Sequence, residues 1–143
     1  FKYHGEVFYY QIRFSGKTKI RYLFPQISAK PPYVIDHGQG LRNIIVVEGV
    51  YDAIAALIMA PDYIPFAVLG SSISDYQLDF LSEYVPEKIL CYLDDTEKSM
   101  GVAKKIRKRI DYCPINIIKS NGEDPEECMK RKLRAGNNLQ WIK

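Results

Sequence analysis

The stretch from Ile44 to Leu57 constrains the fold more than any other part of the sequence. Four consecutive apolar residues, 44–47, lead directly into Glu48 and Gly49, and an apolar helical pattern starts at Asp52. The four apolar residues predict a strand that is buried on both faces. Glu48 then falls at the carboxyl end of this strand, where open α/β sheets bind their ligands. Gly49 allows a sharp turn and leaves space beside the acid. Taken alone, Glu48 is better explained as a surface acid at the end of a strand, and Asp52 as a helix cap.

The sequence continues as an alternation of strands and helices. Further strands are predicted at 65–69, 88–93 and 114–118, and helices at 52–59, 74–84, 102–110 and 126–133. Strands separated by helices form crossover connections and a mainly parallel sheet. The fold class is therefore α/β, with a mainly parallel four-stranded sheet flanked by helices.

The first 43 residues differ from the rest in pattern and charge. They contain seven Lys or Arg residues against two acids, whereas the whole chain of 143 residues has a net charge of +3. Residues 6–14 and 18–24 alternate around Gly16 and predict a basic β-hairpin. Residues 25–43 contain several Pro and Gly and predict an irregular connector. We thus predict a basic β-rich part over 1–43, an α/β domain over 44–134 and a tail over 135–143. Because the chain starts at Phe1, we expect it to be part of a longer protein.

Carboxylates follow three of the four predicted strands. They are Glu48, the pair Asp94 and Asp95, and then Asp124 with Glu126. The carboxyl ends of parallel strands share one edge, where several acids repel one another unless a cation is bound. Carboxylate oxygens suit Mg²⁺ or Mn²⁺, so the sequence predicts a metal site at this edge. Ordinary soluble turns are the alternative for any single site.

Four segments in order resemble the TOPRIM domain, which primases, topoisomerases and related nucleases share. They are VVEGVYDAIAAL, VLGSSIS, ILCYLDD and NGEDPEE. LGSSISDYQLDFL and GEDPEE, with the basic hairpin and RYLFP, are similar to DnaG-type bacterial or phage DNA primases. The family's second motif is Asp-x-Asp, but Thr96 stands where its second aspartate is expected if Asp94 is the first. Asp95, or else Glu97, would then supply that ligand.

The resemblance implies a Rossmann-like TOPRIM fold and a nucleotidyltransferase that acts in DNA replication. It would synthesise short RNA primers on single-stranded DNA from ribonucleoside triphosphates, with Mg²⁺ or Mn²⁺ as cofactor and possible contact with the replicative helicase. Asp94, Asp95, Asp124 and Glu126 would hold the ions, with Glu97 in reserve. Glu48 would hold a metal or act as acid–base, and Asp52 would support it. The shortened amino-terminal part and the unusual second motif favour a phage or another mobile element.

Basic and small residues complete the expected site. Lys17, Lys19, Arg21 and Lys30 would follow template phosphates, although a solvated hairpin face explains each of them equally well. Gly70, Ser71 and Ser72 after the second strand could bind phosphate through backbone N–H groups, or form a plain turn. The basic run 104–109 is better explained as a solvated helix face than as a nucleic-acid patch.

Two other functions remain open at this point. One is a different TOPRIM enzyme, such as a nuclease or topoisomerase, that cuts nucleic acid with the same acids. The other is a non-catalytic DNA-binding module, which the altered Asp-x-Asp motif favours. Three cysteines without metal-type spacing, and no signal or membrane-spanning segment, predict reduced thiols in the cytoplasm of a bacterial cell or a phage-infected host.

Overall fold

The computed structural model describes residues 2–3, 6–7, 9, 12–13, 22–23, 25, 29–36, 38, 40–119 and 122–134. The chain divides into two compact units, Phe1–Pro31 and Pro32–Lys143. In the first unit, β1 (Lys2–Tyr3) pairs with β2 (Glu6–Val7), and β3 (Ile12–Arg13) pairs with β4 (Tyr22–Leu23), both antiparallel. The pairing of β3 with β4 agrees with the predicted hairpin. The pair β1–β2 was not predicted.

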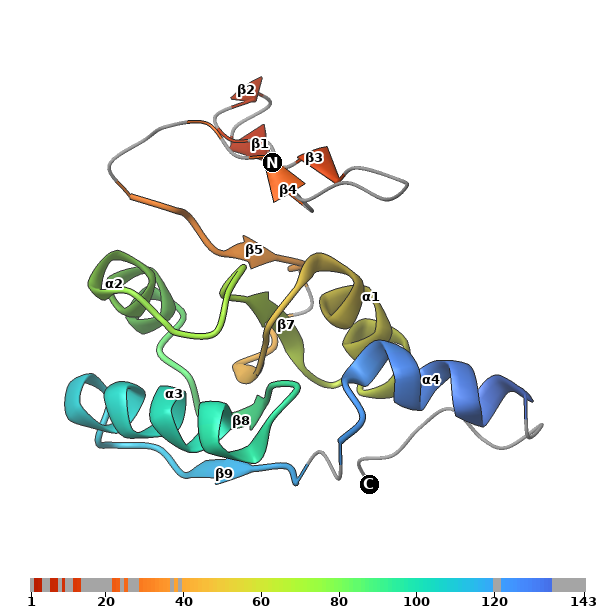
Figure 1. Ribbon diagram of the computed structural model, residues 1–143. Coiled ribbons are helices and arrows are strands. Elements are labelled where there is room, and N and C mark those ends of the chain that lie inside the picture. Colours follow the sequence, from red (N-terminus) through yellow and green to blue (C-terminus); the bar gives the residue numbers. More distant parts are fainter. Residues whose placement is uncertain are drawn as a thin grey trace. The chain divides into compact units, whose positions relative to one another are not determined.

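The second unit is built on a five-stranded sheet in the order β5-β7-β6-β8-β9 (Figure 1). Its strands are β5 (Tyr33–Val34), β6 (Asn43–Val47), β7 (Ile64–Ala67), β8 (Lys88–Tyr92) and β9 (Ile115–Ile117). The four predicted strands pair in parallel, which confirms the mainly parallel sheet. The fifth strand, β5, pairs antiparallel with β7. It lies within residues 25–43, which were predicted to form an irregular connector. Two residues directly after two prolines are too few to show an alternating pattern, so the sequence did not predict it.

Four helices accompany the sheet. They are α1 (Val50–Met59), α2 (Asp75–Glu83), α3 (Thr96–Arg109) and α4 (Pro125–Arg134). α3 begins six residues before the predicted start at residue 102, because Asp95 accepts a hydrogen bond from the Glu97 N–H and caps the helix. The first turn of α3 is polar, so the apolar pattern becomes visible only at Val102. α1 contacts α4 and α2 contacts α3, which places the two pairs on different sides of the sheet (Figure 1).

The central strand β6 is buried on both faces, as its apolar run predicts. Ile44 and Val46 belong to one hydrophobic core with Leu81 of α2 and Ile106 of α3. Residues 45 and 47 point to the opposite face, and all four apolar residues of β6 are 0% exposed. Burying each of them contributes about 1.5–3 kcal/mol. This packing fixes the carboxyl end of β6 rigidly.

The connections around β6 create a switch in direction. From β6 the chain crosses through α1 to β7 on one side, and then through α2 to β8 on the other side of β6. The helices of two such connections lie on opposite faces, and open α/β sheets bind their ligands at such a reversal, here at the carboxyl ends of β6 and β8. The segments that follow these two strands are therefore the expected place for a ligand.

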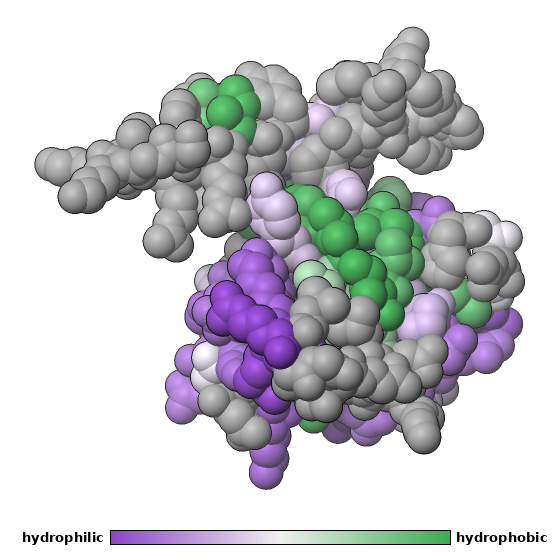
Figure 2. All heavy atoms as spheres, turned by 90° about the vertical axis from the view of Figure 1, so that its right-hand side faces the viewer, coloured by the Kyte–Doolittle hydropathy of each residue, from purple (hydrophilic) through white to green (hydrophobic). Residues whose placement is uncertain are grey.

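Helix α1 is apolar on its outer side as well. Ile54 is 39% and Ile58 is 44% exposed, although a surface helix normally presents polar residues there. Figure 2 shows the side of the molecule on which α1 and α4 lie, where hydrophobic residues gather in a patch beside hydrophilic ones. Among the described residues, no helix combines the length and the apolar character needed to cross a lipid bilayer.

A buried serine ties the end of β8 to α3. Ser99 is 0% exposed, and its Oγ accepts a hydrogen bond from the Leu93 N–H at 2.9 Å. We expect Ser99→Ala to lower the free energy of unfolding by about 1–3 kcal/mol, because the buried N–H loses its partner. Urea unfolding followed by circular dichroism measures this. The control is Ser82→Ala, which removes a hydroxyl group that donates to the Leu78 carbonyl. It should change the free energy of unfolding by less than about 0.5 kcal/mol. A larger change would show that loss of any serine hydroxyl in a helix has this effect.

Candidate functional site

Glu48 and Asp94 lie at the carboxyl ends of neighbouring strands. In the parallel pairing of β6 with β8, Val47 is opposite Tyr92. Glu48 is the next residue after Val47, and Asp94 comes two residues after Tyr92. The strand register thus brings two acids that are 46 positions apart in the sequence to the same edge, at the switch point of the sheet.

The start of α1 places a third acid at this edge. The Gly49 N–H donates to Oδ2 of Asp52 at 2.9 Å, and Asp52 is only 7% exposed. A Cβ at Gly49 would lie 3.1 Å from the same Oδ2, so the glycine leaves the space that Asp52 needs. Its backbone, with φ of −125°, is extended and open to any residue. The chain bends at Glu48 and Gly49, which agrees with the predicted sharp turn, although this turn does not require a glycine. The space that Gly49 leaves lies against Asp52, whereas the predicted space was beside Glu48.

The electrostatics show that carboxylates from three segments converge. Burial, together with the charges of Asp124 and Asp94, raises the pKa of Asp52 to about 7, although hydrogen bonds from the N–H groups of Gly49 and Glu126 act in the opposite direction. The pKa of Asp94 is raised by burial and then by Glu48. The pKa of Asp124 is raised by burial, and also by Asp94 and Glu126. We call this set, Glu48, Asp52, Asp94, Asp124 and Glu126, the acidic edge.

Helix α4 supplies the last two members of the acidic edge. Asp124 Oδ1 accepts a hydrogen bond from the Glu127 N–H at 2.7 Å, and Pro125 occupies the first helical position. Glu126 forms an ion pair with Lys130 at 2.5 Å. Both acids therefore lie in or beside the first turn of a helix, where the helix dipole stabilises negative charge.

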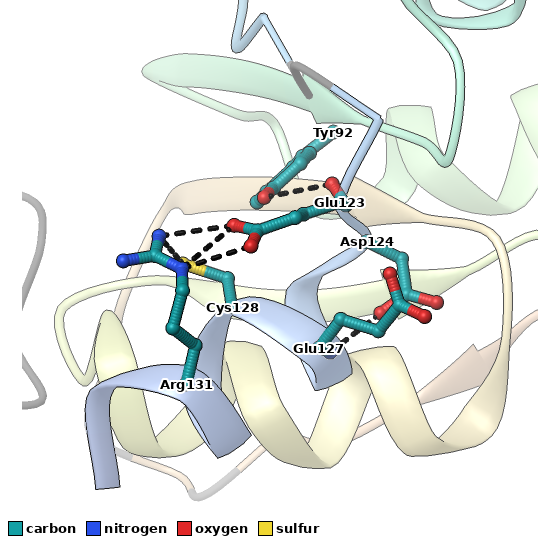
Figure 3. A network of polar contacts seen from close by, with 6 residues as sticks. All are labelled: Tyr92, Glu123, Asp124, Glu127, Cys128 and Arg131. Carbon is teal, nitrogen blue, oxygen red and sulfur yellow. Dashed lines mark hydrogen bonds and ion pairs between the residues drawn. The ribbon is translucent and has the colours of Figure 1, made fainter. Parts of the chain in front are cut away.

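A separate network connects α4 to the sheet (Figure 3). The Tyr92 hydroxyl at the end of β8 donates to the Glu123 carbonyl at 3.1 Å. Arg131 holds the Glu123 carboxylate with two nitrogens, at 2.8 Å from Nε to Oε1 and 2.9 Å from Nη2 to Oε2. These contacts fix the position of the neighbouring Asp124 relative to β8. No sequence signal identified Tyr92 or Arg131, because both contacts depend on tertiary structure.

Asp95 and Glu97 have other surroundings. The carboxylate of Asp95 caps α3, with 2.6 Å between Oδ1 and the Glu97 N. Glu97 lies in the first turn of the same helix and is exposed. Burial, and then the charge of Glu48, raises the pKa of the preceding residue, Asp94. The assignment of Asp95 and Glu97 as metal ligands stays a prediction.

Lys98 is a member of this site that the sequence did not predict. Its Nζ lies 3.3 Å from Oε2 of Glu48, and the two side chains are 37% and 23% exposed. The residues are 50 positions apart, so no local pattern could indicate the contact.

The acidic edge fits a hard divalent cation in its chemistry, because all of its donors are carboxylates. Among the described residues, no three side chains of His, Cys, Asp or Glu lie close enough together to hold one ion. Mg²⁺ usually keeps several waters and binds through one or two carboxylates plus substrate phosphates. The charges of Asp94 and Asp124 interact, and their assignment as metal ligands stays a prediction.

The loop after β7 carries the predicted phosphate-binding residues. Gly70 is half-buried, whereas Ser71 and Ser72 are exposed. Gln77, 1% exposed, anchors the loop by donating from Nε2 to the Val68 carbonyl at 2.9 Å. Leu69 makes the turn with a φ of 58°. Gln77 was missed, although Ser-x-x-Gln at residues 74–77 is a capping-box signal. Phosphate binding by this loop stays a prediction.

The predicted nucleic-acid contacts are only partly within the described structure. Lys17, Lys19 and Arg21 lie outside the described residues. Lys30 is half-buried, and burial lowers its pKa.

The basic run on α3 contacts the protein itself. Lys105 donates to the Ile73 carbonyl at 3.2 Å, Arg107 donates to the Ile115 carbonyl at 3.2 Å, and Arg109 forms an ion pair with Asp79. All three are exposed. These contacts agree with the interpretation as a solvated helix face.

Comparisons with known proteins agree with this geometry. The sequence model of the Toprim-like family matches residues 45–129, more than half of the chain. A DNA primase domain from Pseudomonas aeruginosa has a similar structure, with a TM-score of 0.61 and 20% identity over 92% of this chain and 46% of that chain. The zinc-binding and RNA polymerase domains of the Aquifex aeolicus primase give a TM-score of 0.56 and 19% identity, over 92% and 36%. The chain thus spans less than half the length of either structure, and the likeness concerns the fold. No curated protein matches the sequence.

Proposed function

The chain belongs to the Toprim-like family, and from this premise we propose that it is the metal-dependent catalytic part of a DNA primase. It would synthesise short RNA primers on single-stranded DNA from ribonucleoside triphosphates. The observation that carries the proposal is the convergence of Glu48, Asp94 and Asp124 at the switch point of the sheet. Fold similarity to two primase domains supports this choice among the activities of the family.

The residues of the acidic edge would divide the work. A divalent ion would neutralise charge on the triphosphate and hold the reacting oxygens in line. Asp94 and Asp124 would hold this ion, with Asp95, Glu97 and Glu126 as further candidates. Asp52 would keep the start of α1 in place through its bond from Gly49.

Glu48 is placed to assist the attacking hydroxyl group. The primer 3′-oxygen would form a bond to the α-phosphorus, while the bond from this phosphorus to the bridging oxygen breaks and pyrophosphate leaves. The hydroxyl proton would pass to Glu48 or to water. Gly70, Ser71 and Ser72 would donate backbone N–H groups to a phosphate, because their loop borders the same edge of the sheet.

Template binding would fall to the first unit. Lys17, Lys19, Arg21 and Lys30 would contact phosphates along single-stranded DNA without reading its sequence. Binding would therefore weaken as salt concentration rises. A replicative helicase would be a partner of the longer protein.

Primer synthesis on single-stranded DNA with labelled ribonucleotides tests the proposal. We expect RNA products in Mg²⁺ or Mn²⁺ and none after chelation with EDTA. Fragments of an added duplex, without primers, would instead indicate a nuclease or topoisomerase-like activity. DNA binding without any metal-dependent product would indicate a non-catalytic module, the alternative that the altered Asp-x-Asp motif favours.

A further inference from the structure

We propose that Lys98 is an internal counter-ion that takes the place of a cation on Glu48. A divalent ion would then reach Glu48 only by displacing the lysine ammonium group. This inference rests on the proposed function in one respect, because it assumes that the acidic edge binds a divalent cation. It goes further in naming what such a cation must compete with in this chain.

The contact geometry supports a specific pair. Nζ of Lys98 lies 3.3 Å from Oε2 of Glu48, within hydrogen-bond distance, and neither side chain is more than 37% exposed. Lys98 is the third residue of α3, where the helix dipole disfavours a positive charge. Its position is therefore explained by the acids around it and not by the helix. Asp94 and Asp95 add further negative charge around the same ammonium group.

The acids of the acidic edge differ in whether they form an ion pair with a lysine. Among the described residues, Glu48 and Glu126 have lysine partners, Lys98 and Lys130, whereas no ion pair joins Asp94 or Asp124 to a cation. A first divalent ion thus has the strongest reason to bind near these two aspartates. Glu48 would join only when Lys98 moves away.

Lys98 therefore tunes the affinity of the acidic edge for metal. Removing the ammonium abolishes the competition for Glu48, so the carboxylate becomes available to the incoming ion. A partly exposed ion pair is worth up to about 1 kcal/mol, or roughly a fivefold change in an equilibrium constant. We expect Lys98→Met to tighten Mn²⁺ binding by about three- to fivefold.

Titration of the purified chain with Mn²⁺, followed by electron paramagnetic resonance of the free ion, tests this without any assay of activity. Lys104→Met is the matched control, because it removes the same charge from an exposed position of the same helix. We expect it to change Mn²⁺ affinity less than twofold. Lys98→Arg keeps the charge and should bind Mn²⁺ as the unmodified chain does, within about twofold. Circular dichroism checks that each variant is folded.

A double-mutant cycle with Glu48→Gln separates displacement from general electrostatics. In the Glu48→Gln background, the gain from Lys98→Met should fall below about twofold, the part left to the weaker interaction of Lys98 with Asp94. Equal effects of Lys98→Met and Lys104→Met would overturn the inference, as would a gain that persists at full size without the Glu48 carboxylate. Mn²⁺ binding that is unaffected by Lys98→Met would overturn the inference alone and leave the proposed function standing. Absence of Mn²⁺ binding in every variant would overturn both.

Discussion

Glu48→Gln is expected to reduce metal-dependent primer synthesis by about 100-fold or more. The Glu48 carboxylate follows β6 at the switch point of the sheet and can accept a proton or bind a metal, whereas the amide of glutamine cannot accept the proton and is a much weaker ligand. Loss of a positioned acid–base group typically costs about 10²–10⁴ in rate. Single-turnover extension of a primed template with a labelled ribonucleotide measures the step itself. Extension at the unmodified rate would remove Glu48 from this role.

This loss can be separated from misfolding. Glu48 is partly exposed, and its one described ion pair, with Lys98, contributes at most about 1 kcal/mol to stability. The urea midpoint of Glu48→Gln should therefore stay close to that of the unmodified chain. Glu83→Gln, an exposed position at the end of α2, serves as the control. It should leave both the rate and the midpoint unchanged.

The frame of the fold was predictable because its signals are local. A strand of four consecutive apolar residues is stable when both of its faces are buried. The run at 44–47 therefore predicted that β6 lies in the middle of the sheet, where these residues are 0% exposed. The start of α3 was missed because a capped polar turn carries no apolar period, and Asp95 as its cap is visible only in the hydrogen bond to Glu97. β5 was missed because two residues directly after two prolines are too few to show an alternating pattern.

The acidic edge was predictable to the same extent as the sheet. Parallel strands deliver their carboxyl ends to one side, so the proximity of Glu48 to Asp94 followed from the strand pattern alone. The residues that modify these acids were not predictable. Lys98 contacts Glu48, which is 50 positions away in the sequence. Ser99 accepts a hydrogen bond from the Leu93 N–H, but it lies in the first turns of α3, which were not predicted to be helical. Such partners depend on side-chain packing, which no periodicity encodes.

Asp52→Asn is expected to stabilise the metal-free fold at neutral pH, on the order of 3 kcal/mol. Burial and the neighbouring charges of Asp124 and Asp94 raise the pKa of this carboxyl from 3.8 to about 7. Below about pH 4 it is protonated in both the folded and the unfolded chain, and it has no effect on the pH dependence of stability. Between about pH 4 and 7 only the unfolded chain releases the proton, so the folded state loses stability as pH rises. Above about pH 7 the loss is complete.

Asparagine removes this loss and keeps the acceptor that the Gly49 N–H needs. Urea unfolding in EDTA from pH 4 to 8 should therefore show a gain for Asp52→Asn that is small at pH 4 and grows until about pH 7. Asp111→Asn, an exposed control, should show no such trend. A gain that is constant with pH would show that Asp52 has an ordinary pKa. Saturating Mg²⁺ should reduce the stability difference between Asp52→Asn and the unmodified chain. A cation bound among these carboxylates favours their ionised form, so the ionised Asp52 would cost less stability with Mg²⁺ than in EDTA.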